Sequence, residues 1–423
     1  MAIMSTSDFF DELEIMSPEA RKEYLDQRLS QTIDHAYCNA PAAKAILDRA
    51  GVTPADIRTV KDLEKLSVTR KMDLIELQQA SPPFGGFLAI PIEDVDRIFI
   101  PPGPAYEPHF AESIKWFAKS FYAGGFRKGD IVINSFTYHM SPAGMVLHES
   151  LRACGATPIA MGTGNTDMQI QAMLHLKVNG FIGTPSFLMT IIKQAEQMRH
   201  DFCRDFNLQR AWFTGEMLPP SLRKVLEEDY HINTSQAYAV TDTGGAVAYE
   251  CLQKSGMHLM DEYLMEIVDH ETGKQLGPGE IGEIVVTPLH NQTWGLIRFG
   301  TGDLSTYITE PCPCGRTANR LVSIVGRTGD AVKVRGMFVV AKQAEQALLA
   351  FDEVSRFQLI VGRKGQRDEL ILNVELEDEA IDRDRLSGEL SKEFQSVCRV
   401  KLDDIKFVPK GTIPEQRQTI ADE

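Results

Sequence analysis

The chain has 423 residues, more than one domain usually holds, which predicts two or three domains. Hydrophobic residues make up 43% and charged residues 24%, as in a soluble globular protein with a sizeable core. The net charge of −15 argues against nucleic acid as a partner, because binding a phosphate backbone needs a local excess of Lys and Arg.

The sequence also argues against a membrane partner. No apolar run approaches the ~20 residues that a membrane span requires. The stretch "MAIMSTSDFFDELEIMS" lacks the basic start and apolar segment of a signal peptide. We therefore expect a cytoplasmic location, where the seven cysteines would not form disulfides.

Helices are predicted over the first 80 residues, where Ser17 is a candidate N-cap followed by Pro18 and Glu19. From about Phe99 to Thr287 apolar strands alternate with helical segments, one of which is expected to be capped by Thr166 or Asp167. This alternation is the pattern of an α/β sheet with parallel strands. After Tyr238 two strands joined by a Gly- and Pro-rich turn predict antiparallel β structure.

These patterns predict an α/β protein with a small α+β unit at its C-terminus. The expected N-terminal domain spans residues 1–326, with a helical start at 1–80, an α/β part at 81–237 and a β-rich part at 238–326. The expected C-terminal lid spans residues 327–423.

The stretch "RIFIPPGPAYEPHF" places a short strand, Ile98–Ile100, before a proline-rich loop that contains Gly103. Loops that leave a strand in this way often cradle phosphate with glycine N–H groups, hydroxyls and a lysine. Here the hydroxyls and the lysine are missing, and Glu107 adds a negative charge. The residues alone leave open an ordinary turn or a phosphate loop without its chemistry.

Four cysteine and histidine residues suggest a metal site. "PCPCGR" supplies Cys312 and Cys314 in a tight turn, and "YECLQKSGMH" supplies Cys251 and His258 on neighbouring predicted strands. Three thiolates and one imidazole suit structural Zn²⁺. The alternative is four unrelated buried residues.

Four motifs in order resemble the phenylacetate–coenzyme A ligase family of the adenylate-forming enzymes. They are "FTGEMLPPSLR", "AYAVTDTGG", "LIRFGTGDLS" and "GRTGDAVKVRGMFV". The resemblance runs from about Arg97 to Pro414 and implies a large α/β domain with a β subdomain and a mobile α+β lid. It also implies ATP or AMP, Mg²⁺ and coenzyme A as ligands.

The resemblance assigns nucleotide-binding roles to Glu216, Tyr238, Thr241, Asp242, Arg298 and Asp303, and catalytic roles to Asp242 and Arg327. Asp303 can accept hydrogen bonds from two ribose hydroxyls, and Tyr238 can stack on a base. Asp242 stands where the family has a glutamate that helps to hold Mg²⁺, and it is shorter by one methylene. Arg298 and Arg327 can pair with phosphate or brace the domain joint, the alternative being a surface salt bridge.

The chain departs from the family at three places. The family's phosphate loop reads Ser-Ser-Gly-Thr-Thr-Gly-Lys-Pro, and here Gly103 and Pro108 match while Glu107 replaces the lysine. The C-terminal lysine of the family falls at Thr419, although Arg417 can substitute. The lid hinge is expected at Gly329, where the family has an aspartate. These changes predict weak binding of the ATP triphosphate.

Contacts to the acid are expected from Tyr138, His139 and Met140, which lie where the family places aryl contacts; the alternative is core packing. The resemblance implies an enzyme that joins ATP and an aromatic or related carboxylic acid into an acyl-adenylate, and then forms a thioester with coenzyme A or another thiol. The alternatives are a degenerate homologue that binds an acid or nucleotide without activating it, and an enzyme that uses a preformed activated acid. A homodimer is a further possibility.

Overall fold

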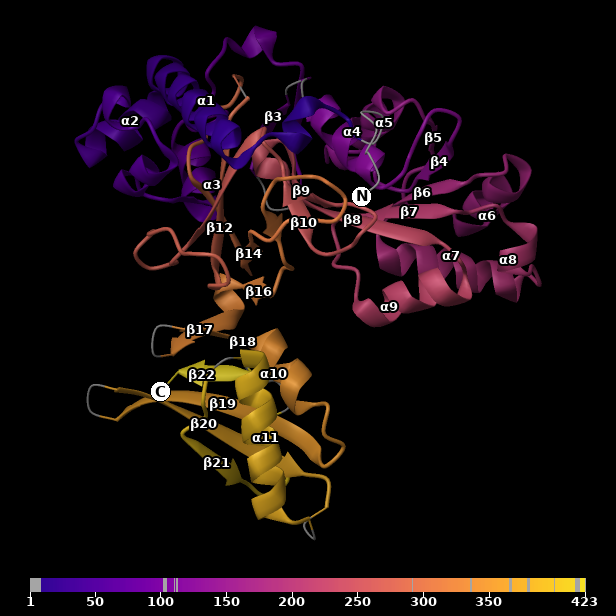
Figure 1. Cartoon of the computed structure of the whole chain (residues 1–423), viewed down its shortest axis with the longest axis vertical. Helices are drawn as coiled ribbons and strands as arrows, with labels where there is room; N and C mark the ends of the chain where they lie inside the picture. Colours follow the sequence, from indigo (N-terminus) through magenta and orange to yellow (C-terminus); the bar gives the residue numbers. More distant parts are fainter. Residues whose placement is uncertain are drawn as a thin grey trace.

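The computed structural model describes residues 9–101, 105–109, 111, 113–290, 292–334, 337–364, 367–378, 381–398, 400–414 and 419–422. A large lobe occupies the upper part of Figure 1, and the lid forms a separate lobe below it. Within the described residues, no helix combines the length and apolarity that crossing a bilayer needs.

The chain begins with helices, as predicted. They are α1 (Pro18–Asn39), α2 (Pro41–Ala50) and α3 (Lys71–Ala80). The Ser17 hydroxyl accepts a hydrogen bond from the Ala20 N–H, so the predicted N-cap of α1 is confirmed.

The centre of the large lobe is a nine-stranded sheet with the strand order β14-β15-β10-β9-β8-β7-β6-β4-β5. Its parallel part contains β4 (Ile131–Asn134), β5 (Thr157–Ala160), β6 (Gly180–Gly183), β7 (Arg210–Phe213) and β8 (Asn233–Val240). Antiparallel strands extend it: β9 (Gly245–Glu250), β10 (Met257–Leu259), β14 (Tyr307–Ile308) and β15 (Arg320–Leu321).

Helices cover both faces of the parallel part (Figure 1). They are α4 (Ser113–Ala123), α5 (Ala143–Ala153), α6 (Thr166–His175), α7 (Pro185–Gln197), α8 (Phe202–Asp205) and α9 (Pro220–Lys224). Neighbouring strand residues point to opposite faces, because side chains alternate along a strand. Phe181 and Phe213 pack in the hydrophobic cluster of α6 and α7, whereas Ile182 and Trp212 pack in the cluster of α4 and α5. The predicted parallel α/β sheet is therefore confirmed.

A second sheet has the order β1-β13-β12-β11, with β16 beside β13. Its strands are β1 (Thr69–Arg70), β11 (Tyr263–Val268), β12 (Gly282–Pro288), β13 (Phe299–Ser305) and β16 (Gly326–Arg327). β11 and β12 are the antiparallel pair predicted around the Gly- and Pro-rich turn.

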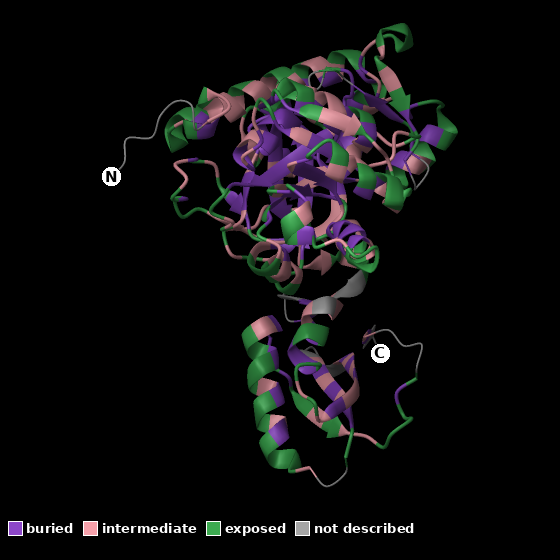
Figure 2. Cartoon of the chain, turned by 90° about the vertical axis from the view of Figure 1, so that its right-hand side faces the viewer, coloured by how far each residue is buried: buried purple, intermediate pink, exposed green. Residues whose placement is uncertain are grey.

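The lid has its own hydrophobic core, formed by buried residues between Val334 and Ile420 (Figure 2). It contains β17 (Ala331–Val334), β18 (Met337–Val340), α10 (Ala341–Leu348), β19 (Val354–Lys364), β20 (Arg367–Leu376), α11 (Arg383–Cys398), β21 (Asp404–Phe407) and β22 (Ile420–Asp422). The predicted boundary after residue 326 falls inside β16.

Two local predictions differ from the structure. The predicted strand Ile98–Ile100 begins one residue earlier, as β2 (Arg97–Phe99), and pairs with β3 (Glu107–His109) in a hairpin. The sequence predicted Thr166 or Asp167 as the N-cap of α6, but Asn165 holds that position with a φ of 47°. Asn tolerates this left-handed conformation, so the helix begins at Thr166 itself.

Candidate active site

One side of the site is a cavity of about 650 Å³ between the main sheet and β13. Tyr238 on β8 donates a hydrogen bond of 2.8 Å to Asp303 Oδ2 on β13. Arg327 Nε on β16 donates one of 3.0 Å to Asp303 Oδ1, because β13 and β16 pair at these two residues. Burial, and then Asp303, hold the pKa of Tyr238 well above its usual value, so its hydroxyl remains a donor. We call this part the adenosine side.

A smaller, largely apolar cavity of about 270 Å³ adjoins it, and we call this the acid cavity. Its wall includes Phe99, Pro108, Phe117, Phe136, Pro142, Ala143, Val146 and Leu147. Thr214, Gly215 and Ala239 line both cavities, so the two spaces meet along the ends of β7 and β8. One extended ligand can therefore occupy an apolar and a polar compartment at once.

The phosphate-loop position lies beside the acid cavity. Glu107, on β3, is 5% exposed and accepts a 2.9 Å hydrogen bond from the Thr241 hydroxyl. Burial, and then the nearby Asp242 carboxylate, raise the pKa of Glu107 to about 8. Asp242 is 9% exposed, and its oxygens lie 3.2 and 3.3 Å from Lys71 Nζ at the start of α3. We call Glu107, Asp242 and Lys71 the phosphate side; Pro102, Gly103 and Pro104 lie outside the described residues.

The three residues predicted to contact the acid lie between Phe136 and Ser141, which line the cavity, but none of the three is in its wall. Tyr138 is half-buried, and its hydroxyl lies 3.0 Å from both Asn134 Nδ2 and His148 Nδ1. His139 and Met140 are exposed. The cavity is lined by residues on either side of them, from Phe136 and from Ser141 onward.

Other predicted residues separate into two groups. Glu216 lines the cavity of the adenosine side and accepts a hydrogen bond of 2.9 Å from Ser186, and Thr241 lines the acid cavity. Arg298 instead is 1% exposed and pairs with Glu266 at 2.9 and 3.1 Å. Its remaining N–H groups donate to the carbonyls of Leu66 and Gly273. Arg298 therefore braces the second sheet inside the large lobe, which differs from the phosphate contact, the domain joint and the surface salt bridge considered for it.

Two predicted lid residues, Gly329 and Thr419, line neither cavity, whereas Gln343 and Gln346 on α10 line the larger one. Gly329 belongs to the 3-10 turn η8 (Thr328–Asp330), between β16 and β17. Thr419, at the position of the family's lysine, donates a hydrogen bond of 2.8 Å to Glu345 on α10. Arg417 and Gln418 lie outside the described residues.

The four predicted metal ligands come together. The Sγ atoms of Cys251, Cys312 and Cys314 and a ring nitrogen of His258 all lie within 4.8 Å of one another. Cys251 Sγ is 3.7 Å from Cys312 Sγ, and Cys314 Sγ is 3.4 Å from His258 Nε2. Two thiolates on a tetrahedral Zn²⁺ lie about 3.8 Å apart, so the donor set fits this ion.

A buried network ties this cluster to the N-terminal segment. The backbone N–H of Arg316 donates to Cys314 Sγ at 3.4 Å, and Arg316 Nε donates to Glu14 Oε1 at 2.5 Å. The Tyr249 hydroxyl donates to the same oxygen at 2.6 Å. These contacts join η2 (Glu12–Ile15) to β9 and to the turn that contains Cys314.

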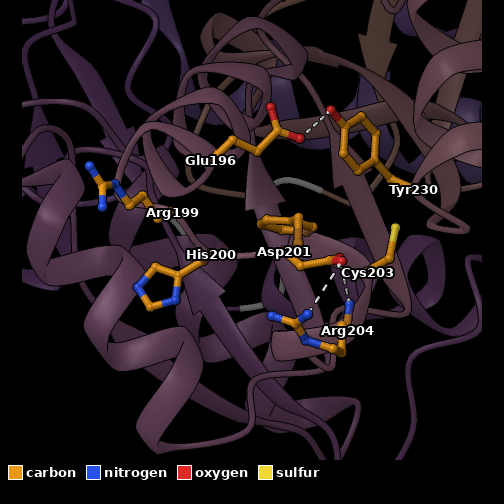
Figure 3. Close-up of a pocket in the computed structure, with 8 residues that line it drawn as sticks. Glu196, Arg199, His200, Asp201, Cys203, Arg204 and Tyr230 are labelled. Carbon is orange, nitrogen blue, oxygen red and sulfur yellow. Dashed lines mark hydrogen bonds and ion pairs between the residues drawn. The ribbon is translucent and has the colours of Figure 1, made fainter.

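A third, shallow cavity lies beside α7 and α8, away from the lid (Figures 1 and 3). Its charged groups pair among themselves: Tyr230 donates to Glu196 at 2.9 Å, and Arg204 lies 3.9 Å from Asp201. The two adjoining cavities, with their apolar and polar walls, are therefore the stronger candidate for an active site.

Sequence reasoning missed two features of this site. Lys71 reaches Asp242 across 171 residues of chain, and nothing in its local sequence signals the contact. Phe117 on α4 and Phe136 after β4 line the acid cavity, but in the sequence they have the pattern of core residues. Glu107, in contrast, could be singled out from the sequence, because a carboxylate is unusual at a phosphate-loop position.

Comparisons with known proteins show the family to which the chain belongs and its fold. Residues 116–289 match the model of the AMP-binding enzymes, and residues 336–421 match that of the AMP-binding enzyme C-terminal domain. The chain is 31% identical over 379 residues to a phenylacetate-coenzyme A ligase of Thermus thermophilus, which covers 87% of this chain and 84% of the relative. It is 29% identical over 428 residues to the Escherichia coli enzyme of the same name, covering 97% and 96%.

The fold comparison extends over the whole chain. An open conformation of 2-hydroxyisobutyryl-CoA ligase, solved in complex with 2-HIB-AMP and CoA, matches with a TM-score of 0.91 and 22% identity. The match covers 100% of this chain and 96% of the other. The fold is therefore that of the adenylate-forming enzymes, and the chain belongs to the phenylacetate-coenzyme A ligase family.

Proposed function

We propose that this protein is an acid–coenzyme A ligase that first forms an acyl-adenylate from ATP and an aromatic or related carboxylic acid. The observation that carries this proposal is the pair of cavities that share Thr214, Gly215 and Ala239. An acyl-adenylate has the same division, with an apolar acyl group at one end and a polar nucleoside at the other. The relatives are named phenylacetate-coenzyme A ligases, which supports an aromatic acid.

Each compartment has a distinct task in this reaction. The acid would lie among Phe99, Phe117 and Phe136, in a cavity of about 270 Å³. The ribose hydroxyls would donate to Asp303, and Tyr238 would lie against the base. Arg327 would face the phosphate, and Asp242 would help to hold Mg²⁺.

The chemistry needs two displacements. An oxygen of the acid attacks the α-phosphorus of ATP, a P–O bond forms, and pyrophosphate leaves with the electron pair of the broken bond. The sulfur of coenzyme A then attacks the acyl carbon, a C–S bond forms, and AMP leaves. The thiol proton passes to solvent or to AMP.

A second candidate function is supported by Glu107. A carboxylate in place of the phosphate-loop lysine opposes the binding of a triphosphate, and such a protein could accept a preformed acyl-adenylate instead. This protein would catalyse only the second displacement.

Two assays with the same panel of aromatic acids separate these functions. Exchange of labelled pyrophosphate into ATP reports the first displacement, and mass spectrometry of acyl-CoA formed from a synthetic aroyl-AMP reports the second. Exchange together with acyl-CoA formation supports the full ligase. Acyl-CoA formation without exchange supports the second candidate. If neither exchange nor acyl-CoA is detected, both functions are excluded.

We propose further that the Cys251, His258, Cys312 and Cys314 cluster holds one structural Zn²⁺. Four protein ligands leave no open coordination position for chemistry. Metal analysis of the purified protein should give about one zinc per chain. Cys312→Ser should lower thermal stability more than it changes AMP affinity, whereas zinc-free wild-type protein would contradict the proposal.

We also propose a cytoplasmic location. None of the seven cysteines is in a disulfide, which fits this location.

A further inference from the structure

The cavity of the adenosine side has residues of the lid in its wall. Two glutamines of α10, Gln343 and Gln346, line it together with residues of the large lobe. Figure 1 shows α10 at the end of the lid that faces the large lobe. A nucleotide in this cavity would therefore lie between the two lobes and could contact side chains from both.

A buried apolar contact holds α10 beside this cavity. Val340, the residue before α10, is buried and packs against Leu304, which follows Asp303 in β13. This packing requires a glycine at position 326, because a Cβ on Gly326 would overlap with Val340 Cγ1. The first turn of α10 is thus held close to the strand that contains Asp303.

Gln343 has a hydrogen-bond acceptor that lacks a partner. Its Oε1 atom is buried and has no hydrogen-bond partner among the described residues. No other described side chain in the wall of this cavity has a buried polar atom in that state. A buried carbonyl oxygen without a partner costs free energy, because it has lost water and gained nothing in its place. A ligand that fills the cavity and donates a hydrogen bond to Oε1 would remove this cost.

Two other polar side chains of the wall already have protein partners. Arg223 pairs with Glu250 at 2.8 and 2.9 Å, and Gln236 donates to the same carboxylate at 3.0 Å. The wall also includes apolar side chains, those of Met217, Leu218, Met257, Ile324 and Val325. Apolar side chains suit the flat face of a base, and Gln343 supplies a polar group for its edge.

We propose that Gln343 of the lid binds the adenine base of the nucleotide, with Oε1 accepting from the N6 amino group and Nε2 donating to an adjacent ring nitrogen. A side-chain amide matches this edge of adenine, where a donor lies beside an acceptor. A phosphate is a poor alternative partner, because the amide is neutral and Gln343 is not among the residues that the two cavities share. This inference rests on the proposed use of an adenine nucleotide.

The contact would give the nucleotide one anchor in each lobe. Asp303 of the large lobe would accept from the ribose, and Gln343 of the lid would hold the base. A ligand that contacts both lobes in one orientation of the lid favours that orientation, because it binds the others less tightly. The bound base would therefore stabilise the present position of α10.

The test is calorimetry of the full-length protein with AMP and with purine riboside 5′-monophosphate, which has a hydrogen in place of the N6 amino group. The wild type should bind AMP about tenfold more tightly, and Gln343→Met should lose most of this preference. Gln343→Glu should keep it, because a carboxylate still accepts from the amino group. Gln395→Met, at an exposed position of α11, is the matched control and should change neither affinity.

Hydrogen exchange of the wild type tests the same contact without a substitution. AMP should slow the exchange of the α10 amides more than purine riboside 5′-monophosphate does. Thermal denaturation shows whether each variant is folded, and a changed preference between the two nucleotides at unchanged stability assigns the effect to the base.

Two results would overturn this contact and leave the ligase function intact. One is an AMP affinity that Gln343→Met does not change. The other is AMP binding that leaves the exchange of α10 unaltered, because the base would then lie away from the lid. A wild type that binds no AMP would overturn the proposed function together with this contact.

Discussion

The adenosine side and the phosphate side adjoin the same pair of cavities, but they are balanced in different ways. On the adenosine side Asp303 accepts from both Tyr238 and Arg327, and Arg327 is 70% exposed to solvent. On the phosphate side Lys71 pairs with Asp242, Glu107 accepts from the Thr241 hydroxyl, and both carboxylates are nearly inaccessible. The first set has no net charge and includes the exposed Arg327, whereas the second is buried and has a net negative charge when both carboxylates are ionised. Binding on the phosphate side should therefore respond to pH and to cations, whereas binding on the adenosine side should not.

The largest effect that we expect from this difference is a dependence of stability on pH. An ordinary glutamate in the unfolded chain loses its proton near pH 4.5, whereas burial raises the pKa of Glu107 to about 8 in the folded protein. Between these values the folded state holds a proton that the unfolded state has lost. The free energy of unfolding should thus fall as pH rises from about 4.5 to about 8, by up to about 1.4 kcal/mol per unit.

Urea denaturation at pH 5 to 8, without added divalent cation, measures this effect. The difference in unfolding free energy between the wild type and Glu107→Gln isolates the contribution of Glu107. Glu107→Gln should gain a few kcal/mol over the wild type across this range. Parallel pH profiles of the two proteins would mean that Glu107 is not buried as a carboxyl group.

The next largest effect concerns the adenosine side. Asp303→Ala removes the acceptor expected for the ribose hydroxyls, and a hydrogen bond to a charged group contributes about 1.5–3 kcal/mol. AMP affinity should fall by roughly 100-fold, measured by calorimetry. Asp201→Ala, at the shallow cavity of Figure 3, is the control and should not change it. Equal losses for Asp303→Ala and Glu107→Gln would abolish the distinction between the two sides.

The fold could be predicted largely from local signals in the sequence. Ser17 and Pro18 mark the start of α1 by their own chemistry, and alternation along β6 and β7 requires two covered faces. The cluster of three cysteines and one histidine could also be predicted, since Cys312 and Cys314 lie in one turn, Cys251 directly follows β9 and His258 lies on the paired strand β10.

Long-range pairing could not be predicted in the same way. Arg298 belongs to a motif that the family uses for nucleotide binding, but its guanidinium is held by Glu266 and two distant carbonyls. Lys71 reaches Asp242 only because β1 pairs with β13 and brings the start of α3 to the site. Such contacts depend on the packing of separate elements, and no local pattern specifies them.

A smaller effect is expected when the phosphate side is given the family's charge. Glu107→Lys restores a cation beside Asp242 and removes the excess negative charge. In buffer without divalent cation, ATP affinity should rise about tenfold, and AMP affinity should remain the same because AMP lacks the β- and γ-phosphates. Calorimetry with both nucleotides, with and without Mg²⁺, tests this. Tight ATP binding by the wild type without Mg²⁺ would show that other groups hold the triphosphate.

The smallest effect is expected at the joint between the large lobe and the lid. If Gly329 is the hinge, the lid rotates about it between the first and the second displacement. Different residues of the lid then face the phosphate side in each of the two steps. A Cβ at Gly329 would meet nothing within 4 Å, so Gly329→Ala fits the present conformation and should leave stability nearly unchanged. The substitution should slow the rotation of the lid, because alanine has fewer accessible backbone conformations than glycine. Acyl-CoA formation should slow about two- to threefold while pyrophosphate exchange keeps its rate. Gly388→Ala, within the lid and equally unobstructed, is the matched control and should alter neither rate. If Gly329→Ala slowed both reactions equally, the residue would act on the site itself and not on the movement of the lid.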